Sequence, residues 1–127
     1  MPEPTFAEIR RALRDAPDLK PAHVFAGMPY VFRAERARGI AATYYFDLSG
    51  AHGGRWTVRV GGDGCETNEG APDRWDAMIA CDAATFLDLA TATVRPGEAF
   101  IDGKLIVAGD LALAMRFSRF FGNGAER

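Results

Sequence analysis

The stretch from residue 96 to residue 121, PGEAFIDGKLIVAGDLALAMRFSRFF, constrains the fold more than any other part of the chain. It starts with turn residues and has a second turn at Asp102-Gly103. The run 105–108 is apolar and too short for a helix, so we predict a strand there. Asp110 is a good helix N-cap, because its carboxylate accepts hydrogen bonds from the free N–H groups of a first helical turn. From residue 111 to residue 121 the pattern is helical.

The predicted final helix has little polar surface. Between residues 111 and 121 only Arg116, Ser118 and Arg119 are clearly polar, whereas a surface helix normally shows a broad polar face. Two interpretations are open. Either the helix is buried within the protein, or part of its apolar surface is completed by something outside the chain, such as a lipid.

Length and composition limit the class of protein. The chain has 127 residues, enough for one domain with a hydrophobic core. Its content of 25% charged and 48% hydrophobic residues is ordinary, and a net charge of −2 favours neither nucleic acid nor an anionic membrane as a partner. The N-terminus lacks the apolar segment of a secretory signal, and no apolar run approaches the ~18 residues of a transmembrane helix. We expect a cytoplasmic protein without stable membrane insertion.

Two helices are predicted before the first strand. Thr5 and Glu8 form a capping-box pattern for a helix that ends near Arg14. Pro21 fits the first turn of a second helix. Pro29 removes a backbone donor inside that helix, so we expect a kink there or a division into two short helices.

The middle of the chain predicts a sheet. Strands are expected over 40–48, 55–60, 65–68 and 75–81, and a helix over 83 to about 91 follows. Arg55 and Arg59 fall on the opposite face of their strand from Trp56, which argues against a nucleic-acid platform. The order of elements indicates an α+β fold, with a single sheet and helices packed on one face.

No group of residues has the spacing of a catalytic or metal site. His23 and His52 lack the neighbours of a catalytic base or a metal ligand. Cys65 and Cys81 have no pairing motif, and a buried Cys behaves as a small hydrophobe. We therefore predict no enzyme activity, no metal and no cofactor. Two tryptophans and nine phenylalanines are more than one helical layer on one sheet needs, and the surplus could line an internal cavity.

The final stretch also follows a longer pattern, Pro-x-x-Ala-Phe-x-x-Gly-Lys-Leu-x-Ile/Val-x-Gly-Asn/Asp-x-x-Leu-Ala-Met. The matching residues are Pro96, Ala99, Phe100, Gly103, Lys104, Leu105, Val107, Gly109, Asp110, Leu113, Ala114 and Met115. This pattern resembles the C-terminal signature of the sterol carrier protein type 2 family. The resemblance extends more weakly to about Pro21. Ala92-Thr93 replaces the family's Gly-Lys, so we expect a different end of the preceding helix. Trp75 replaces a small residue close to where a ligand would lie, so the identity of the ligand does not carry over.

The resemblance implies a five-stranded, mostly antiparallel sheet and an apolar tunnel between the sheet and the helices. It implies a non-catalytic protein that binds and carries a lipid: a fatty acid, a fatty acyl-CoA, a sterol-like molecule or an isoprenoid. Residues 1–127 would form a single domain, with 1–20 as a helical extension outside the family pattern. The residues expected to line the tunnel are Tyr44, Trp56, Met78, Phe86, Leu89, Ala90, Phe100, Ile101, Leu105, Leu113, Met115 and Phe117.

Two other functions stay open. The chain could be an accessory module that docks to enzymes of a lipid or isoprenoid-quinone pathway, with its cationic first helix as the contact for a protein partner. It could also be an enzyme that uses the cavity as an active site, which a His or Cys pointing into the cavity would favour. The sequence leaves the oligomeric state open.

Overall fold

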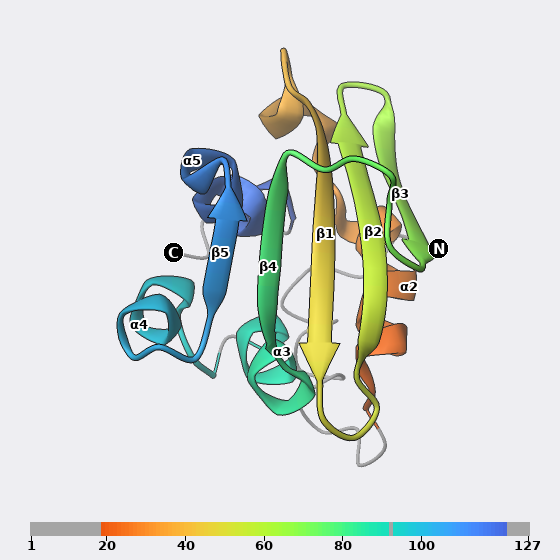
Figure 1. The fold of residues 1–127 in the computed structure, drawn as a ribbon. Coiled ribbons are helices and arrows are strands. Elements are labelled where there is room, and N and C mark those ends of the chain that lie inside the picture. Colours follow the sequence, from red (N-terminus) through yellow and green to blue (C-terminus); the bar gives the residue numbers. More distant parts are fainter. Residues whose placement is uncertain (1–18, 92, 122–127) are drawn as a thin grey trace.

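The fold is a five-stranded sheet with helices on one face (Figure 1). The computed structural model describes residues 19–91 and 93–121. The strands are β1 (Ala41–Ser49), β2 (Gly54–Gly61), β3 (Gly64–Glu69), β4 (Ala77–Asp82) and β5 (Ile106–Gly109), in the spatial order β3-β2-β1-β4-β5. Only the β1–β4 pair is parallel among these strands. The predicted α+β class and the mostly antiparallel sheet are therefore confirmed.

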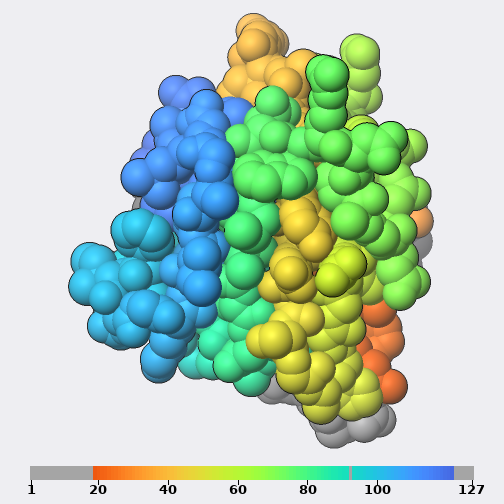
Figure 2. Space-filling model, viewed as in Figure 1, coloured from red at the N-terminus to blue at the C-terminus, as the bar shows by residue number. Residues whose placement is uncertain are grey.

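The helices gather behind the sheet as it is viewed in Figure 1. They are α2 (Pro21–Val31), α3 (Ala83–Ala90), α4 (Pro96–Ile101) and α5 (Leu111–Arg116), with 3₁₀ turns η1 (Ala34–Ala37) and η2 (Phe117–Phe120). Figure 2 shows the other face of the sheet, with no helix in front of the strands. The predicted packing of helices on one face is confirmed. The predicted helix from Thr5 to Arg14 lies outside the described residues.

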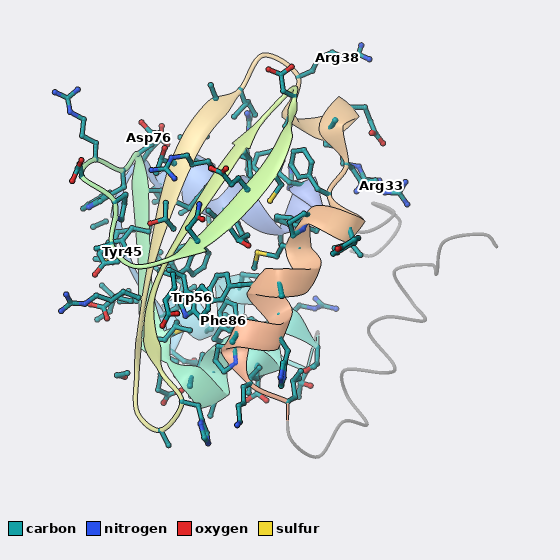
Figure 3. All side chains as sticks on the ribbon, turned by 90° about the vertical axis from the view of Figure 1, so that its right-hand side faces the viewer. Arg33, Arg38, Tyr45, Trp56, Asp76 and Phe86 are labelled. Carbon is teal, nitrogen blue, oxygen red and sulfur yellow. The ribbon has the colours of Figure 1, made fainter. Side chains whose placement is uncertain are left out.

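Alternation along β1 directs its apolar residues toward the helices. Ala42, Tyr44, Phe46 and Leu48 are all buried, as a strand with a period of two requires. In the side view of Figure 3, Trp56 and Phe86 lie between the sheet and the helices, whereas Tyr45 lies on the outer face. The core therefore forms between one face of the sheet and the helical layer.

Helix α2 continues through Pro29 as one helix of 11 residues, although the sequence predicted a kink or a division. Proline has no N–H to donate to the carbonyl four residues earlier, which belongs to Phe25. Thr67 on β3 supplies the missing donor, because its hydroxyl donates to the Phe25 carbonyl at 3.0 Å. The ring of Phe25 is fully buried and stacks on Trp56 and Phe86, with centroid distances of 4.6 and 4.8 Å. A tertiary contact thus maintains the helix.

Helix α4 corrects the prediction of a turn at residue 96. Pro96 occupies the first helical turn, where its missing N–H costs nothing, and Ala99 is fully buried. The Asp102 N–H donates to the Glu98 carbonyl at 2.9 Å, and the Lys104 N–H donates to the Ala99 carbonyl, also at 2.9 Å. A six-residue helix therefore precedes the turn that the sequence predicts at Asp102-Gly103.

The final helix is also shorter than predicted. It is α-helical only to Arg116 and then tightens into the 3₁₀ turn η2. In a 3₁₀ turn residues i and i+3 share one side. Phe117 and Phe120 consequently both reach the ring of Tyr44, at centroid distances of 4.8 and 6.4 Å.

The Gly109-Asp110 pair joins β5 to α5 through Asp76. Gly109 has φ +83°, and a Cβ at this position would lie 2.5 Å from the Asp76 carbonyl oxygen. The Asp110 N–H donates to that same carbonyl at 2.9 Å, and the Asp110 carboxylate accepts from the Leu113 N–H at 3.0 Å. Asp76 in turn accepts from the Thr43 N–H at 2.7 Å. The predicted N-cap of Asp110 is thus confirmed, and the glycine permits the close approach.

Candidate functional site

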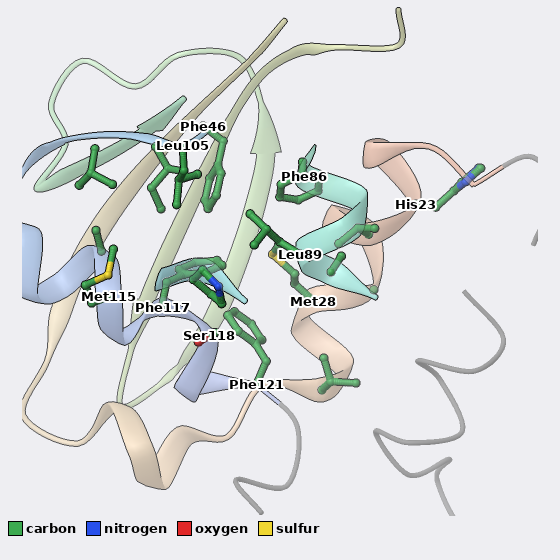
Figure 4. Close-up of a pocket in the computed structure, with 18 residues that line it drawn as sticks. His23, Met28, Phe46, Phe86, Leu89, Leu105, Met115, Phe117, Ser118 and Phe121 are labelled. Carbon is green, nitrogen blue, oxygen red and sulfur yellow. The ribbon is translucent and has the colours of Figure 1, made fainter. Parts of the chain in front are cut away.

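A cavity of about 200 Å³ lies between the sheet and the helices (Figure 4). Its lining residues are His23, Val24, Gly27, Met28, Val31, Phe46, Ile79, Phe86, Leu89, Ala90, Pro96, Leu105, Val107, Ala114, Met115, Phe117, Ser118 and Phe121. Every helix named above contributes to this wall, together with β1, β4 and β5. Of the described residues that line the cavity, only His23 and Ser118 have a polar side chain.

Local periodicity positions the helical part of the wall. On α2 the lining residues recur at the three- and four-residue spacing that keeps side chains on one helix face, from Val24 through Met28 to Val31. On α3, Phe86, Leu89 and Ala90 follow the same spacing. On the sheet, Phe46 and its β4 partner Ile79 face the cavity from adjacent strands.

Phenylalanine rings make the cavity narrow. Phe46 lies edge-on to Phe86 and to Phe117, with centroid distances of 5.8 and 5.0 Å, and Phe117 lies 5.0 Å from Phe121. Figure 4 shows Phe46, Phe86, Leu89 and Phe117 around the middle of the cavity. These contacts stabilise the domain and also occupy space that a ligand would otherwise fill.

Half of the residues expected from the sequence lie in this wall. They are Phe86, Leu89, Ala90, Leu105, Met115 and Phe117, which come from α3, the segment before β5, α5 and η2. The structure therefore brings together residues from two distant parts of the chain, 86–90 and 105–117.

The other six expected residues lie outside the wall. Tyr44 is fully buried one layer deeper, where its hydroxyl donates to the Leu113 carbonyl at 2.7 Å. Trp56 stacks on Phe25. Met78 alternates with the inward-facing Ala77 and Ile79, so it belongs to the outer face of β4.

Phe100, Ile101 and Leu113 are the remaining three. Helix α4 leaves Phe100 41% exposed and Ile101 83% exposed, because its one buried position is Ala99. Leu113 is half-buried and packs against the core without lining the cavity.

The contribution of α2 to the wall was not predicted from the sequence. The signal was present, because apolar residues at helical spacing follow Pro21. The pattern could not show that this face closes the same space as the C-terminal signature, since the two regions are about 80 residues apart in the chain. Two hydrogen-bonded contacts bring the regions together: the Arg33 N–H donates to the Phe120 carbonyl at 2.7 Å, and Phe32 forms a bridge with Phe121.

The histidine of the wall and the two cysteines of the chain are the reactive side chains considered first for catalysis. His23 accepts a hydrogen bond at Nδ1 from the Lys20 N–H at 3.1 Å, and Figure 4 shows its ring at the edge of the cavity, pointing away from the central side chains. Burial raises the pKa of Cys65 to about 11 and that of Cys81 to about 12, the latter with help from Asp82. Both cysteines are therefore neutral thiols near pH 7, and neither lines the cavity.

The described part of the chain has neither a metal-binding cluster nor a helix that could span a membrane. Within residues 19–91 and 93–121, no three His, Cys, Asp or Glu side chains come together as ligands of a metal would. None of the helices in those ranges combines the length and the apolar character that crossing a bilayer requires.

Taken together, the features define a small α+β domain with an apolar cavity between its sheet and its helices. The model of the SCP-2 sterol transfer family matches residues 32–122. The chain belongs to this family.

The curated relatives are much longer proteins. Hydroxysteroid dehydrogenase-like protein 2 of Rattus norvegicus is 33% identical over 86 residues, which are 67% of this chain and 16% of the relative. The same protein of Homo sapiens is 32% identical over 79 residues, or 61% of this chain and 19% of the relative. This chain therefore spans about a sixth to a fifth of those relatives.

Solved structures share the fold at low identity. Sterol carrier protein 2-like 2 of Aedes aegypti has a TM-score of 0.62 at 17% identity, covering 77% of this chain and 89% of that one. The sec-alkylsulfatase Pisa1 from Pseudomonas sp. has a TM-score of 0.74 at 14% identity, over 83% of this chain and 17% of that one. A ubiquinone synthesis protein, UbiJ-SCP2, has a TM-score of 0.53 at 16% identity, over 88% and 84% of the two chains.

Proposed function

We propose that this protein binds a lipid with its apolar chain in the cavity, carries it, and catalyses no reaction on it. The observation that carries the proposal is the character of the wall, which has sixteen lining residues without a polar side chain against two with one. Each CH₂ group that leaves water for such a wall gains ~0.8 kcal/mol. A lipid chain can therefore offset its immobilisation cost without a specific polar contact. Membership of the SCP-2 sterol transfer family supports the same function.

The groups around the wall support a non-catalytic role. An active site needs an acid, a base or a nucleophile within reach of the substrate. Here the histidine of the wall caps α2, and both cysteines are neutral thiols outside it. The lipid is accordingly cargo, and a cytoplasmic location, in which a carrier exchanges lipids between membranes or enzymes, is part of the proposal.

The candidate ligands are fatty acids, fatty acyl-CoA, sterol-like molecules and isoprenoids. A solution structure of the Aedes aegypti protein is of its palmitated form, which supports a fatty acyl chain. The test is native mass spectrometry and lipid extraction of purified protein, followed by titration with a fluorescent fatty acid. We expect a co-purified lipid and a saturable signal. The absence of both a bound lipid and a saturable titration would refute the proposal.

A pair of variants on α3 sharpens this test. Ala90→Phe adds a ring inside the cavity, whereas Ala84→Phe adds the same ring at an exposed position outside it. We expect the first variant to lose at least tenfold in affinity and the second to bind as the original protein does. Equal affinities in the two variants would show that the fatty acid binds elsewhere.

A second candidate function is that of an accessory module that docks to enzymes of a lipid or isoprenoid-quinone pathway. The similarity to UbiJ-SCP2 favours it. Residues 1–20 would provide the contact with the protein partner through their arginines. Deletion of residues 1–20 should then abolish recovery of the enzymes in a pull-down while fatty acid binding persists. Unchanged recovery after the deletion would reject this function.

A further inference from the structure

The cavity is small for a protein that carries lipids. Its volume is about 200 Å³, whereas ligand pockets commonly have ~300–1,000 Å³. A dry cavity of ~150 Å³ lined by Leu, Ile and Phe accommodates one benzene, which corresponds to about 25 Å³ per carbon. On that scale the space in this protein corresponds to about eight carbons.

Several contacts prevent the cavity from widening freely. Helix α2 forms one wall, and it is held at its middle by the hydrogen bond from Thr67 to the Phe25 carbonyl. Its C-terminal end is held by the hydrogen bond from the Arg33 N–H to the Phe120 carbonyl, 2.7 Å long. The Phe25 ring is stacked between Trp56 and Phe86, so α2 cannot move away without breaking these ring contacts.

We propose that the cavity takes one unbranched apolar chain of about eight to ten carbons, leaves the rest of a longer ligand outside, and excludes a sterol nucleus. This inference rests on the proposed lipid-binding function and specifies its ligand. The rings of Phe46, Phe86 and Phe117 close this part of the wall, because Phe46 contacts the other two at centroid distances of 5.8 and 5.0 Å. The seventeen ring carbons of a sterol nucleus would need about 425 Å³ on the same scale, about twice the volume present, and a rigid nucleus cannot divide. A flexible single chain can place some of its carbons in the cavity and leave the others outside.

Gly27 is the residue that sets the reach of the cavity on the α2 side. It lies in the wall between Val24 and Met28, and a Cβ built on it meets no atom within 4 Å. Glycine within a helix is unfavourable relative to alanine. The open space beside Gly27 is therefore available to a ligand chain, and any larger side chain at this position would occupy it.

The first test measures affinity against chain length. Saturated fatty acids from hexanoate to palmitate, each below its micellar concentration, displace a fluorescent fatty acid from the purified protein. Affinity should rise about fourfold per CH₂ and level off at about eight to ten carbons. A rise that continues unbroken to palmitate, or measurable affinity for cholesterol, would overturn the inference and leave the proposed function standing. If no acid binds, the proposed function itself fails.

The second test uses variants that change the cavity volume and measures how far the plateau of affinity against chain length shifts. Gly27→Leu adds four side-chain carbons and should bring the plateau about four carbons earlier, and Leu89→Ala, which removes three carbons from the α3 part of the wall, should move it about three carbons later. Gly27→Ala is the control for helix propensity, and Ala26→Leu places the same side chain on the exposed neighbouring position. Both controls should leave the plateau within about one carbon of the original. A plateau that Gly27→Leu and Ala26→Leu shift equally would refute the role of Gly27.

Discussion

The hydroxyl of Thr67 replaces a backbone hydrogen-bond donor that α2 lacks because of Pro29. Pro29 leaves the Phe25 carbonyl without its intrahelical donor, and Thr67 donates to it at 3.0 Å. We predict that Thr67→Val lowers the free energy of unfolding by about 1–2 kcal/mol, because Phe25 is fully buried and its carbonyl loses its substitute donor. The lower half of that range applies if water reaches the partly buried position of Thr67.

A double-mutant cycle with Pro29→Ala tests this explanation directly. Alanine at position 29 has an N–H that can donate to the Phe25 carbonyl, so Thr67→Val should cost only about 0.5 kcal/mol or less in that background. The measurement is urea unfolding of the four proteins followed by far-UV circular dichroism. The expected coupling energy is about 1 kcal/mol and corresponds to a difference of about 3–5 °C in melting temperature.

Thr57→Val is the matched control in both backgrounds. Its hydroxyl donates to the Gly70 carbonyl at 2.7 Å, away from α2, so its cost should not depend on residue 29. The reasoning would be refuted if Thr67→Val cost the same with proline as with alanine at position 29, since the hydrogen bond would then not substitute for the missing donor.

Three further predictions concern a glycine between β5 and α5, a buried tyrosine of β1 and the N-cap of α3. Gly109→Ala should lower the free energy of unfolding by at least about 2 kcal/mol in urea, because φ is +83° and the Asp76 carbonyl lies against the new Cβ. The control Gly97→Ala on α4 should leave the free energy of unfolding unchanged. Equal effects of the two variants would contradict the role given to Gly109. Burial is the main cause, and the charge of Asp110 the second, of the raised pKa of Tyr44. The folded state therefore loses stability as the pH rises above about 10. In thermal melts, Tyr44→Phe should reduce this loss of stability at alkaline pH. Hydrogen bonds from Thr85, chiefly the one from its backbone N–H, lower the pKa of Asp82. Asp82 should therefore make the protein about 1 kcal/mol more stable than Asp82→Ala at neutral pH, and this difference should diminish as the pH falls below about 4. A difference that does not change with pH would refute the capping role of Asp82.

Local periodicity was sufficient to predict most of the sheet. The strands β1 and β2 alternate over many residues, and Asp110 caps a helix as its position predicted. Prediction failed where a distant contact decides the local structure. From the sequence alone Pro29 predicts a break or kink in the helix, because the hydrogen bond from Thr67 to the Phe25 carbonyl is not visible there. From the sequence alone Pro96-Gly97 predicts a turn, because the burial of Ala99, which anchors a short helix, depends on contacts with distant residues.

The cavity was predictable as a region but not residue by residue. An apolar residue that faces inward can belong to the packed core or to the cavity wall, and the two have the same pattern in sequence. Tyr44 and Phe117 illustrate this. Both face the space between the layers, yet Phe117 covers Tyr44 and only Phe117 reaches the cavity. Phe100 belongs to the signature motif and Ile101 follows it at an unspecified position, but the direction of α4 turns both side chains outward.

The same aromatic residues both stabilise this domain and limit what it can hold. Each ring contact around the cavity contributes about 0.5–1.5 kcal/mol beyond the burial of the ring, which is a substantial fraction of the ~5–15 kcal/mol that holds a domain folded. Truncation of Phe46, Phe86 or Phe117 would enlarge the cavity and remove such contacts together. Gly27 differs from them, since it has no side chain in contact with the core. Change at position 27 can therefore alter the length of the bound chain at little cost in stability, and we expect ligand preference among relatives of this fold to vary first at such positions of α2.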